Sequence, residues 1–236
     1  MTSRHKAIKG TLDTGHATEW NDDHQADFTL EIEEYDLSTG VAITSEWDLA
    51  QTSGGSNPVW SLVGAAGQEH AFVVLNTGAT TGQISSMRHM LSGAAGNVTS
   101  PLDLPALNMA LWLEDISGVG VEAEFGFFAS ATVPFTANQA GAYFRINGGD
   151  LYAVTGTGAA ETATLIGAYS EYANYRIKIN STNVEFFVDD LETAAVTQTL
   201  TRPAVALTPK VSVISVGNYD ETINLDALAW SRLRKQ

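Results

Sequence analysis

Apolar and polar residues alternate with a period of two along much of the chain. The alternation is clearest over residues 28–33, 121–127, 175–179 and 184–189. Successive side chains of a β-strand point to opposite faces, so each segment predicts a strand with one buried face and one wetter face. Residues 71–75 and 210–216 are more uniformly apolar, which favours central strands.

Turn-forming residues separate these segments at short spacing, as at Asn147-Gly148-Gly149 and over residues 180–183. Residues 175–179, 184–188 and 192–196 are therefore predicted to form a meander. No segment predicts a convincing helix; residues 80–91 are the only candidate, and Gly82 weakens it. Many short strands without helices, and without an internal repeat, predict one all-β domain, an antiparallel sandwich or barrel, over residues 28–236.

Residues 1–27 differ from the rest of the chain and form a predicted arm. The segment is polar and holds three of the five histidines, His5, His16 and His24. It is too short and too polar to build a core alone. We expect it to lie along its own domain or to reach onto a neighbour.

The charge and composition exclude several classes of function. The formal net charge is −15 and the few basic residues are dispersed, so no basic stripe is present for nucleic acid or an anionic membrane surface. The chain has no cysteine, which excludes disulfides, thiolate nucleophiles and cysteine-ligated zinc. No window reaches the ~18 apolar residues of a membrane span, and the first residues lack a secretory signal, so we expect synthesis in a host cytoplasm.

Four segments in the second half carry a resemblance to a known family. They are residues 141–152, 175–179, 184–190 and 223–230, and together they resemble the later strands of concanavalin A-like lectin/glucanase (LamG-like) domains. Asp190 stands where the family usually has glycine, and Ala227 interrupts the closing strand pattern. The resemblance implies a jelly-roll β-sandwich.

The arm carries a second resemblance. Gly15-His16, Glu19-Trp20-Asn21 and His24 resemble the "WN-x-(D/E)-H" segments near the N-termini of tailed-phage and archaeal-virus tail, fibre and decoration proteins. The resemblance implies location in a virion, other virion proteins as partners, and assembly as a homo-oligomer, often a trimer. His16, Trp20, Asn21 and His24 are the predicted docking residues, with Trp20 as the apolar anchor.

Glycosidases of the lectin/glucanase type need two carboxylates about 5 Å apart in the retaining mechanism. Glu122 with Glu124, and Glu185 with Asp189, are the nearest matches in this sequence. In the first pair the third carboxylate of the family pattern is missing, because Gly126 and Phe128 follow. We therefore expect solvated carboxylates on an outer sheet face, no catalytic residues and no enzyme activity.

Metal and sugar binding have weaker candidates. His16, His24 and the aspartates of residues 22–27 could supply metal ligands, and Asn218, Asp220 and Glu221 could hold a structural Ca²⁺, although a turn is the simpler expectation there. No other cofactor is predicted. Tyr169 and Tyr172 lie in a polar segment and are the predicted platform for a glycan of a host surface.

Three functional hypotheses follow. The leading one is a non-enzymatic structural or attachment protein of a tailed virus, in a capsid decoration, a tail or a fibre. The alternative is a carbohydrate-binding, lectin-like module. The third is an endo-glycanase that uses Glu122 and Glu124.

Overall fold

The computed structural model describes residues 28–36, 47–51, 59–63, 70–89, 99–114, 116, 119–129 and 134–235, with backbone alone for residues 28–72 and 233–235. The described elements are fifteen strands and one short 3₁₀-helix, η5. Their bounds are β1 Phe28–Asp36, β2 Trp47–Gln51, β3 Val59–Val63, β4 His70–Asn76, β5 Ile84–His89, η5 Pro101–Asp103, β6 Ala106–Glu114, β7 Val121–Ala129, β8 Gly141–Asn147, β9 Asp150–Gly156, β10 Glu161–Ala168, β11 Tyr172–Ile179, β12 Val184–Val188, β13 Val196–Gln198, β14 Leu207–Ile214 and β15 Thr222–Lys235.

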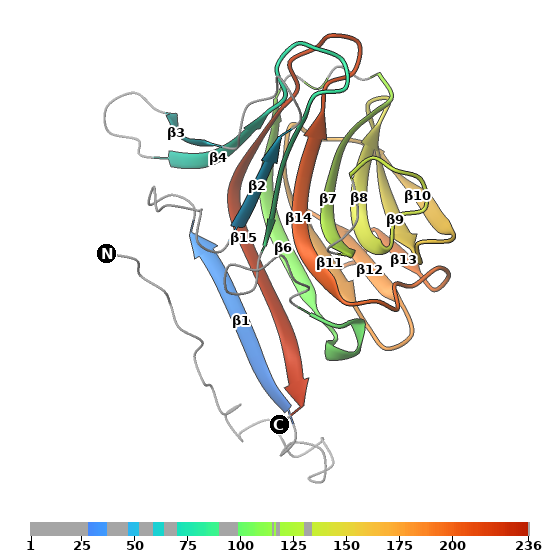
Figure 1. Cartoon of the computed structure of the whole chain (residues 1–236). Helices are drawn as coiled ribbons and strands as arrows, with labels where there is room; N and C mark the ends of the chain where they lie inside the picture. The colour runs from blue at the N-terminus through green and yellow to red at the C-terminus, as the bar shows by residue number, and fades with distance from the viewer. Residues whose placement is uncertain are drawn as a thin grey trace.

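The strands form two antiparallel sheets that face each other (Figure 1). The eight-stranded sheet has the order β13-β12-β11-β6-β15-β4-β3, and β1 pairs with the second part of β15. The seven-stranded sheet has the order β10-β9-β8-β7-β14-β5-β2. The predicted all-β antiparallel jelly-roll sandwich is therefore confirmed. In the described part of the chain, no helix is long and apolar enough to cross a membrane.

Aromatic side chains from both sheets interlock in the core. Phe125 and Phe144 of the seven-stranded sheet stack with ring centroids 5.5 Å apart. Tyr175 of the opposite sheet meets these rings at 4.8 and 5.1 Å, and Phe186 meets Phe144 at 5.3 Å. Edge-to-face and offset pairs of this kind add to the stabilisation from buried apolar area. The core thereby fixes which residues of each strand point inward.

The loops gather at two opposite ends of the sandwich. One end holds the turns at residues 77–83, 147–150, 189–195 and 215–221, and we call it the 215–221 end. The other holds η5, the loops that follow β9 and β13, the first residue of β1 and the last residues of β15; we call it the η5 end (Figure 1).

Most strand predictions are confirmed, and two details are corrected. Residues 80–91, the one helix candidate, contain a turn and then β5. The third strand of the meander begins at Val196, so residues 192–196 are wrong as a strand. The reason is local: the Asp190 carboxylate accepts from the backbone N–H groups of Glu192 and Thr193, at 2.9 and 3.1 Å, and holds them in a turn.

Candidate functional site

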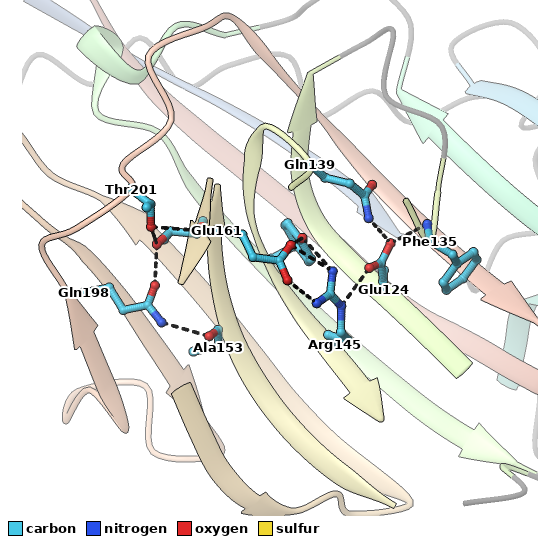
Figure 2. Close-up of polar contacts among 10 residues, drawn as sticks. Glu124, Phe135, Gln139, Arg145, Ala153, Glu161, Gln198 and Thr201 are labelled. Carbon is cyan, nitrogen blue, oxygen red and sulfur yellow. Dashed lines mark hydrogen bonds and ion pairs between the residues drawn. The ribbon is translucent and has the colours of Figure 1, made fainter. Parts of the chain in front are cut away.

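A buried ion pair lies on the outer face of the seven-stranded sheet, the face that points away from the core. Glu124 and Arg145 are cross-strand partners on β7 and β8. Their neighbours Phe125 and Phe144 point into the core, so the ion pair points outward. Arg145 Nε donates to Glu124 Oε1 at 2.9 Å, and the Glu124 side chain has 0% exposure (Figure 2).

The other oxygen of the Glu124 carboxylate is bound by the segment that connects β7 and β8. Glu124 Oε2 accepts from the backbone N–H of Phe135 at 2.9 Å and from Gln139 Nε2 at 2.5 Å (Figure 2). Residues 134–140 therefore lie over this part of the sheet. A buried carboxylate is tolerated only when it is paired and hydrogen-bonded, and both conditions are met here.

Arg145 extends the network to the edge strand. Its Nη1 donates to Glu161 Oε1 of β10 at 2.6 Å, and its Nη2 donates to the Tyr143 hydroxyl at 3.0 Å and to Glu161 Oε2 at 3.2 Å. Burial works against the charge on Glu161, but the hydrogen bond and the charge of Arg145, together with the hydrogen bond from Tyr143, outweigh burial and lower the pKa of Glu161. Burial and then the charge of Glu124 raise the pKa of Tyr143, which keeps its hydroxyl protonated as a donor to Glu161.

The expectation of solvated carboxylates at positions 122 and 124 is wrong, because both side chains are fully buried. Glu122 lies at a bulge at the start of β7, and its Oε1 accepts from the Val119 N–H at 2.8 Å. A side chain at the third position of the glycanase pattern would collide with β8. A Cβ on Gly126 would lie 2.6 Å from both Ala142 O and Tyr143 Cα.

The second carboxylate pair does not converge on one site. Glu185 points outward from β12 and lies 3.7 Å from Lys178 Nζ. Asp189 is exposed at the following turn with φ of 58°, and its Oδ1 accepts from the Asn174 N–H at 3.0 Å. Each carboxylate thus has a local structural partner.

An aromatic pair marks the outer face of the eight-stranded sheet near its 215–221 end. Tyr172 on β11 is the cross-strand partner of Trp112 on β6, and directly opposed residues of antiparallel strands lie about 5 Å apart. Both residues alternate with core residues, so both point outward. Tyr172 is 51% exposed and Trp112 is half-buried. We call this pair the aromatic platform.

Polar groups border the platform. Asn224 of β15 lies on the other side of Trp112 in the sheet and donates from Nδ2 to Glu114 Oε2 at 2.9 Å. Asn174, exposed and two residues after Tyr172, points from the same face. The platform therefore combines apolar ring surface with amide and carboxylate groups.

A shallow hollow of about 360 Å³ continues along the same outer face. Its floor holds the Phe187 ring, with the Arg176 guanidinium 5.5 Å from the ring centroid. Arg176 Nη1 also donates to Leu191 O at 3.2 Å, which links β11 to the turn that follows β12. The full lining is Arg176, Lys178, Glu185, Phe187, Leu191, Glu192 and Ala194.

The two predicted sugar-binding tyrosines have different surroundings. Tyr172 is in the aromatic platform, whereas Tyr169 is partly buried against the core, and its backbone N–H donates to Gly149 O at 3.3 Å. Burial, and then the charge of Glu122, raise the pKa of Tyr169.

Sequence alternation did not predict Trp112 as a platform residue. The β6 sequence Ala-Leu-Asn-Met-Ala-Leu-Trp-Leu is almost uniformly apolar, so period-two alternation does not identify its outer face.

The residues considered for calcium clamp two loops together. Asn218 Oδ1 accepts from Thr81 N and Thr81 Oγ1, at 3.3 and 2.9 Å, and Asp220 Oδ1 accepts from Gly78 N at 2.9 Å. Their oxygens are thus engaged in the contact between the 77–83 and 215–221 turns, as expected of a turn. Within the described ranges, no three His, Asp or Glu side chains gather as metal ligands.

The predicted docking residues His16, Trp20, Asn21 and His24 lie outside the described residues, as do Asp22, Asp23 and Asp27. Their predicted roles in docking and in metal binding stay predictions.

The chain matches no protein-family model and no curated protein. It is similar in structure to lectin and glucanase domains. The VIP36 exoplasmic/lumenal domain, in a Ca²⁺/Man3GlcNAc-bound form, matches with a TM-score of 0.56 and 9% identity over 79% of this chain and 83% of that one. The carbohydrate recognition domain of Emp47p gives 0.55 and 12% over 84% and 93%. The β-glucanase of Bacillus licheniformis gives 0.55 and 12% over 87% and 98%.

These likenesses and the two-sheet topology define the class: the chain has the concanavalin A-like jelly-roll fold that lectin-like carbohydrate-binding domains and glycanases share. Identities of 9–12% establish a likeness of fold. The predicted lectin/glucanase resemblance is therefore confirmed at the level of the fold, and the resemblance of the arm to virion proteins has no counterpart among these structures.

The Arg145–Glu161 pair gives a prediction about stability and pH. Replacing Glu161 with Gln should lower the free energy of unfolding at neutral pH by about 1–2 kcal/mol, since a charged hydrogen bond is lost from a side chain that is 21% exposed. The pKa of Glu161 in the folded chain lies below its ordinary value of 4.5. The contribution of Glu161 to the free energy of unfolding is therefore complete above pH 4.5 and is lost as the pH falls through the lower pKa of the folded chain. Urea unfolding of both proteins from neutral to acidic pH measures the difference.

The control is Glu185→Gln, which breaks the more exposed pair with Lys178 and should change the free energy of unfolding by less than about 0.5 kcal/mol. A Glu161→Gln effect that is no larger than the control, or that does not shrink in acid, would contradict the role given to this pair.

Proposed function

We propose that this chain is a non-catalytic glycan-binding protein that holds its ligand on the outer face of the eight-stranded sheet. The observation that carries the proposal is the cross-strand pair of Tyr172 and Trp112. A sugar ring has an apolar C–H face that packs on an aromatic ring and hydroxyl groups that need polar partners. The exposed side chains of Asn174 and Glu114 supply such partners beside the platform.

The hollow extends this binding surface. It continues from the platform along β11 and β12, and the charged side chains of its lining can contact a second sugar unit. A short oligosaccharide that spans both is therefore the proposed class of ligand. The VIP36 domain with its Man3GlcNAc ligand and the Emp47p carbohydrate recognition domain support a carbohydrate ligand for this fold.

The choice of binding over hydrolysis is supported by the outer face of the other sheet. Glu124, the central carboxylate of the glycanase-like strand, is fully buried, ion-paired and covered by residues 134–140. A general acid or nucleophile must reach the glycosidic bond. The Glu124 carboxylate instead accepts hydrogen bonds from three donors of the protein.

A glycan array followed by titration calorimetry tests this proposal. The wild-type chain should bind a family of related oligosaccharides, and Tyr172→Ala should weaken binding at least tenfold, which equals about 1.4 kcal/mol. The matched control is Leu165→Ala, which removes a similarly exposed apolar side chain from β10 of the other sheet and should leave affinity unchanged. Parallel arrays with Ca²⁺ and with a chelator determine whether the metal contributes.

An array without hits in both conditions would overturn the proposal. Equal losses of affinity from Tyr172→Ala and Leu165→Ala would place the ligand elsewhere on the molecule.

A second candidate function is the structural or attachment role in a tailed-virus particle. The observation that favours it is the arm sequence from Gly15 to His24, with its Trp-Asn-x-x-His string. A glycan-binding sandwich carried on a particle would serve attachment to a host surface, so the two functions are compatible.

Proteomic analysis of particles purified from the source of this sequence tests the virion role. The expected result is that the chain co-purifies with the capsid and tail proteins in a fixed ratio. Its absence from intact particles that contain the other structural proteins would contradict the role.

A further inference from the structure

An apolar hollow of about 250 Å³ lies at the η5 end, between η5 and the segment that follows β13. Leu102 lines the hollow and is 84% exposed, and Leu104, Leu200 and Val205, close in sequence to the lining residues, are exposed as well. Exposed apolar side chains grouped around a hollow mark an interaction surface. The lining residues, which we call the end hollow, are Ser100, Pro101, Leu102, Arg202, Pro203 and Ala204.

Both walls of the end hollow are held rigidly. On one wall, Ser100 Oγ accepts from the Leu102 N–H at 3.2 Å, and Asp103 Oδ2 accepts from the Ser100 N–H at 3.0 Å. This capping box fixes Leu102 in its exposed position. A wall that is already ordered costs little entropy when a partner binds.

The second wall is tied to the opposite sheet. Thr201 adopts a left-handed backbone with φ of 52°, which is rare for a β-branched residue, and its hydroxyl bonds with Thr155 of β9 and Thr162 of β10. Gln198 donates from Nε2 to Ala153 O at 2.8 Å (Figure 2). These bonds hold the start of the 199–206 segment in place.

The predicted arm leaves the domain at this same end. Phe28, the first residue of β1, pairs with Lys235 at the end of β15. Four residues before Lys235, Ser231 of β15 pairs with Ala106, and Ala106 follows η5 by three residues. β1 runs from the η5 end toward the 215–221 end, so its first residue, where the predicted arm joins the domain, lies at the η5 end (Figure 1). Trp20 lies eight positions before Phe28 and can reach roughly 28 Å from it in an extended chain.

The arm and the end hollow are complementary in charge. Four acids surround Trp20 in the arm, at Glu19, Asp22, Asp23 and Asp27. Arg202 is the charged residue of the hollow lining. An arginine beside an aromatic anchor also adds a cation–π contact.

We propose that the end hollow of one copy of this chain receives Trp20 from the arm of a second copy, with the acids of that arm beside Arg202. In this proposal the indole fills the space between Leu102 and Pro203. One tryptophan buries about 150–250 Å². Exchange of whole arms among two or three copies is therefore needed to approach the ~1,200 Å² of a stable interface. This inference stands apart from the glycan-binding proposal.

Light scattering of the full chain during gel filtration tests the exchange. The wild-type chain should elute as an oligomer, whereas Trp20→Ala and Leu102→Glu should each raise the apparent dissociation constant at least tenfold. Leu102 is highly exposed, so its substitution should leave the fold intact, as circular dichroism would verify. Tyr172→Ala is the matched control; it removes an exposed ring far from the end hollow and should leave the oligomer unchanged.

A mixture of the two defective variants gives the most specific test of the proposal. Trp20→Ala chains retain the hollow and Leu102→Glu chains retain the arm, so a mixed pair keeps one intact contact and the mixture should associate more strongly than either variant alone, though less strongly than the wild-type chain. A monomeric wild-type chain, an oligomer that survives both substitutions, or a mixture that associates no more strongly than the separate variants would each overturn the proposal. The glycan array tests the aromatic platform on the outer face of the eight-stranded sheet, whereas gel filtration tests the end hollow. Failure of the glycan-binding proposal therefore leaves the arm-exchange proposal testable, and the reverse also holds.

Discussion

The ion pair of Glu124 and Arg145 determines how the two faces of this sandwich are used. A carboxylate without solvent exposure costs several kcal/mol unless a cation and hydrogen-bond donors replace the lost water. Arg145, Gln139 and the Phe135 N–H provide that replacement, and the last two come from the segment that crosses the sheet. The outer face of the seven-stranded sheet is therefore covered at Glu124. The exposed Tyr172 lies on the other sheet, and the exposed Leu102 lies at the η5 end.

Much of the fold could be predicted because its signals are local. Alternation identified β7, β11 and β12, and the apolar run near residue 210 identified β14 as a central strand. Ala227, which interrupts the pattern of the closing strand, lies at a β-bulge between Leu225 and Ala227 on β15. The expected glycine of the β12 turn is Asp190 here, and the left-handed backbone falls on Asp189 one residue earlier. Pairing between distant strands required the structure.

The candidate sites depend on contacts between residues that are distant in sequence, which local patterns do not predict. Alternation correctly placed Glu124 opposite the core, but its burial depends on Arg145, twenty-one residues later, and on residues 134–140. Tyr172 was predicted from its polar surroundings, whereas its neighbour Trp112 lies 60 positions earlier and meets it only through the β6–β11 register. The end hollow combines segments about one hundred residues apart, so no local pattern could have found it.

The central claim, that Glu124 serves the fold and not a reaction, is tested most directly by the free energy of unfolding of Glu124→Gln. The substitution removes the negative charge of Glu124, whereas Arg145 stays charged and keeps its ion pair with Glu161, so the account predicts a loss of about 1.5–3 kcal/mol. Replacing both partners with apolar residues of similar volume should recover a large part of that loss. Catalytic carboxylates are commonly held at a cost to stability. An unchanged or increased free energy of unfolding for Glu124→Gln, measured by urea denaturation at neutral pH, would contradict the account.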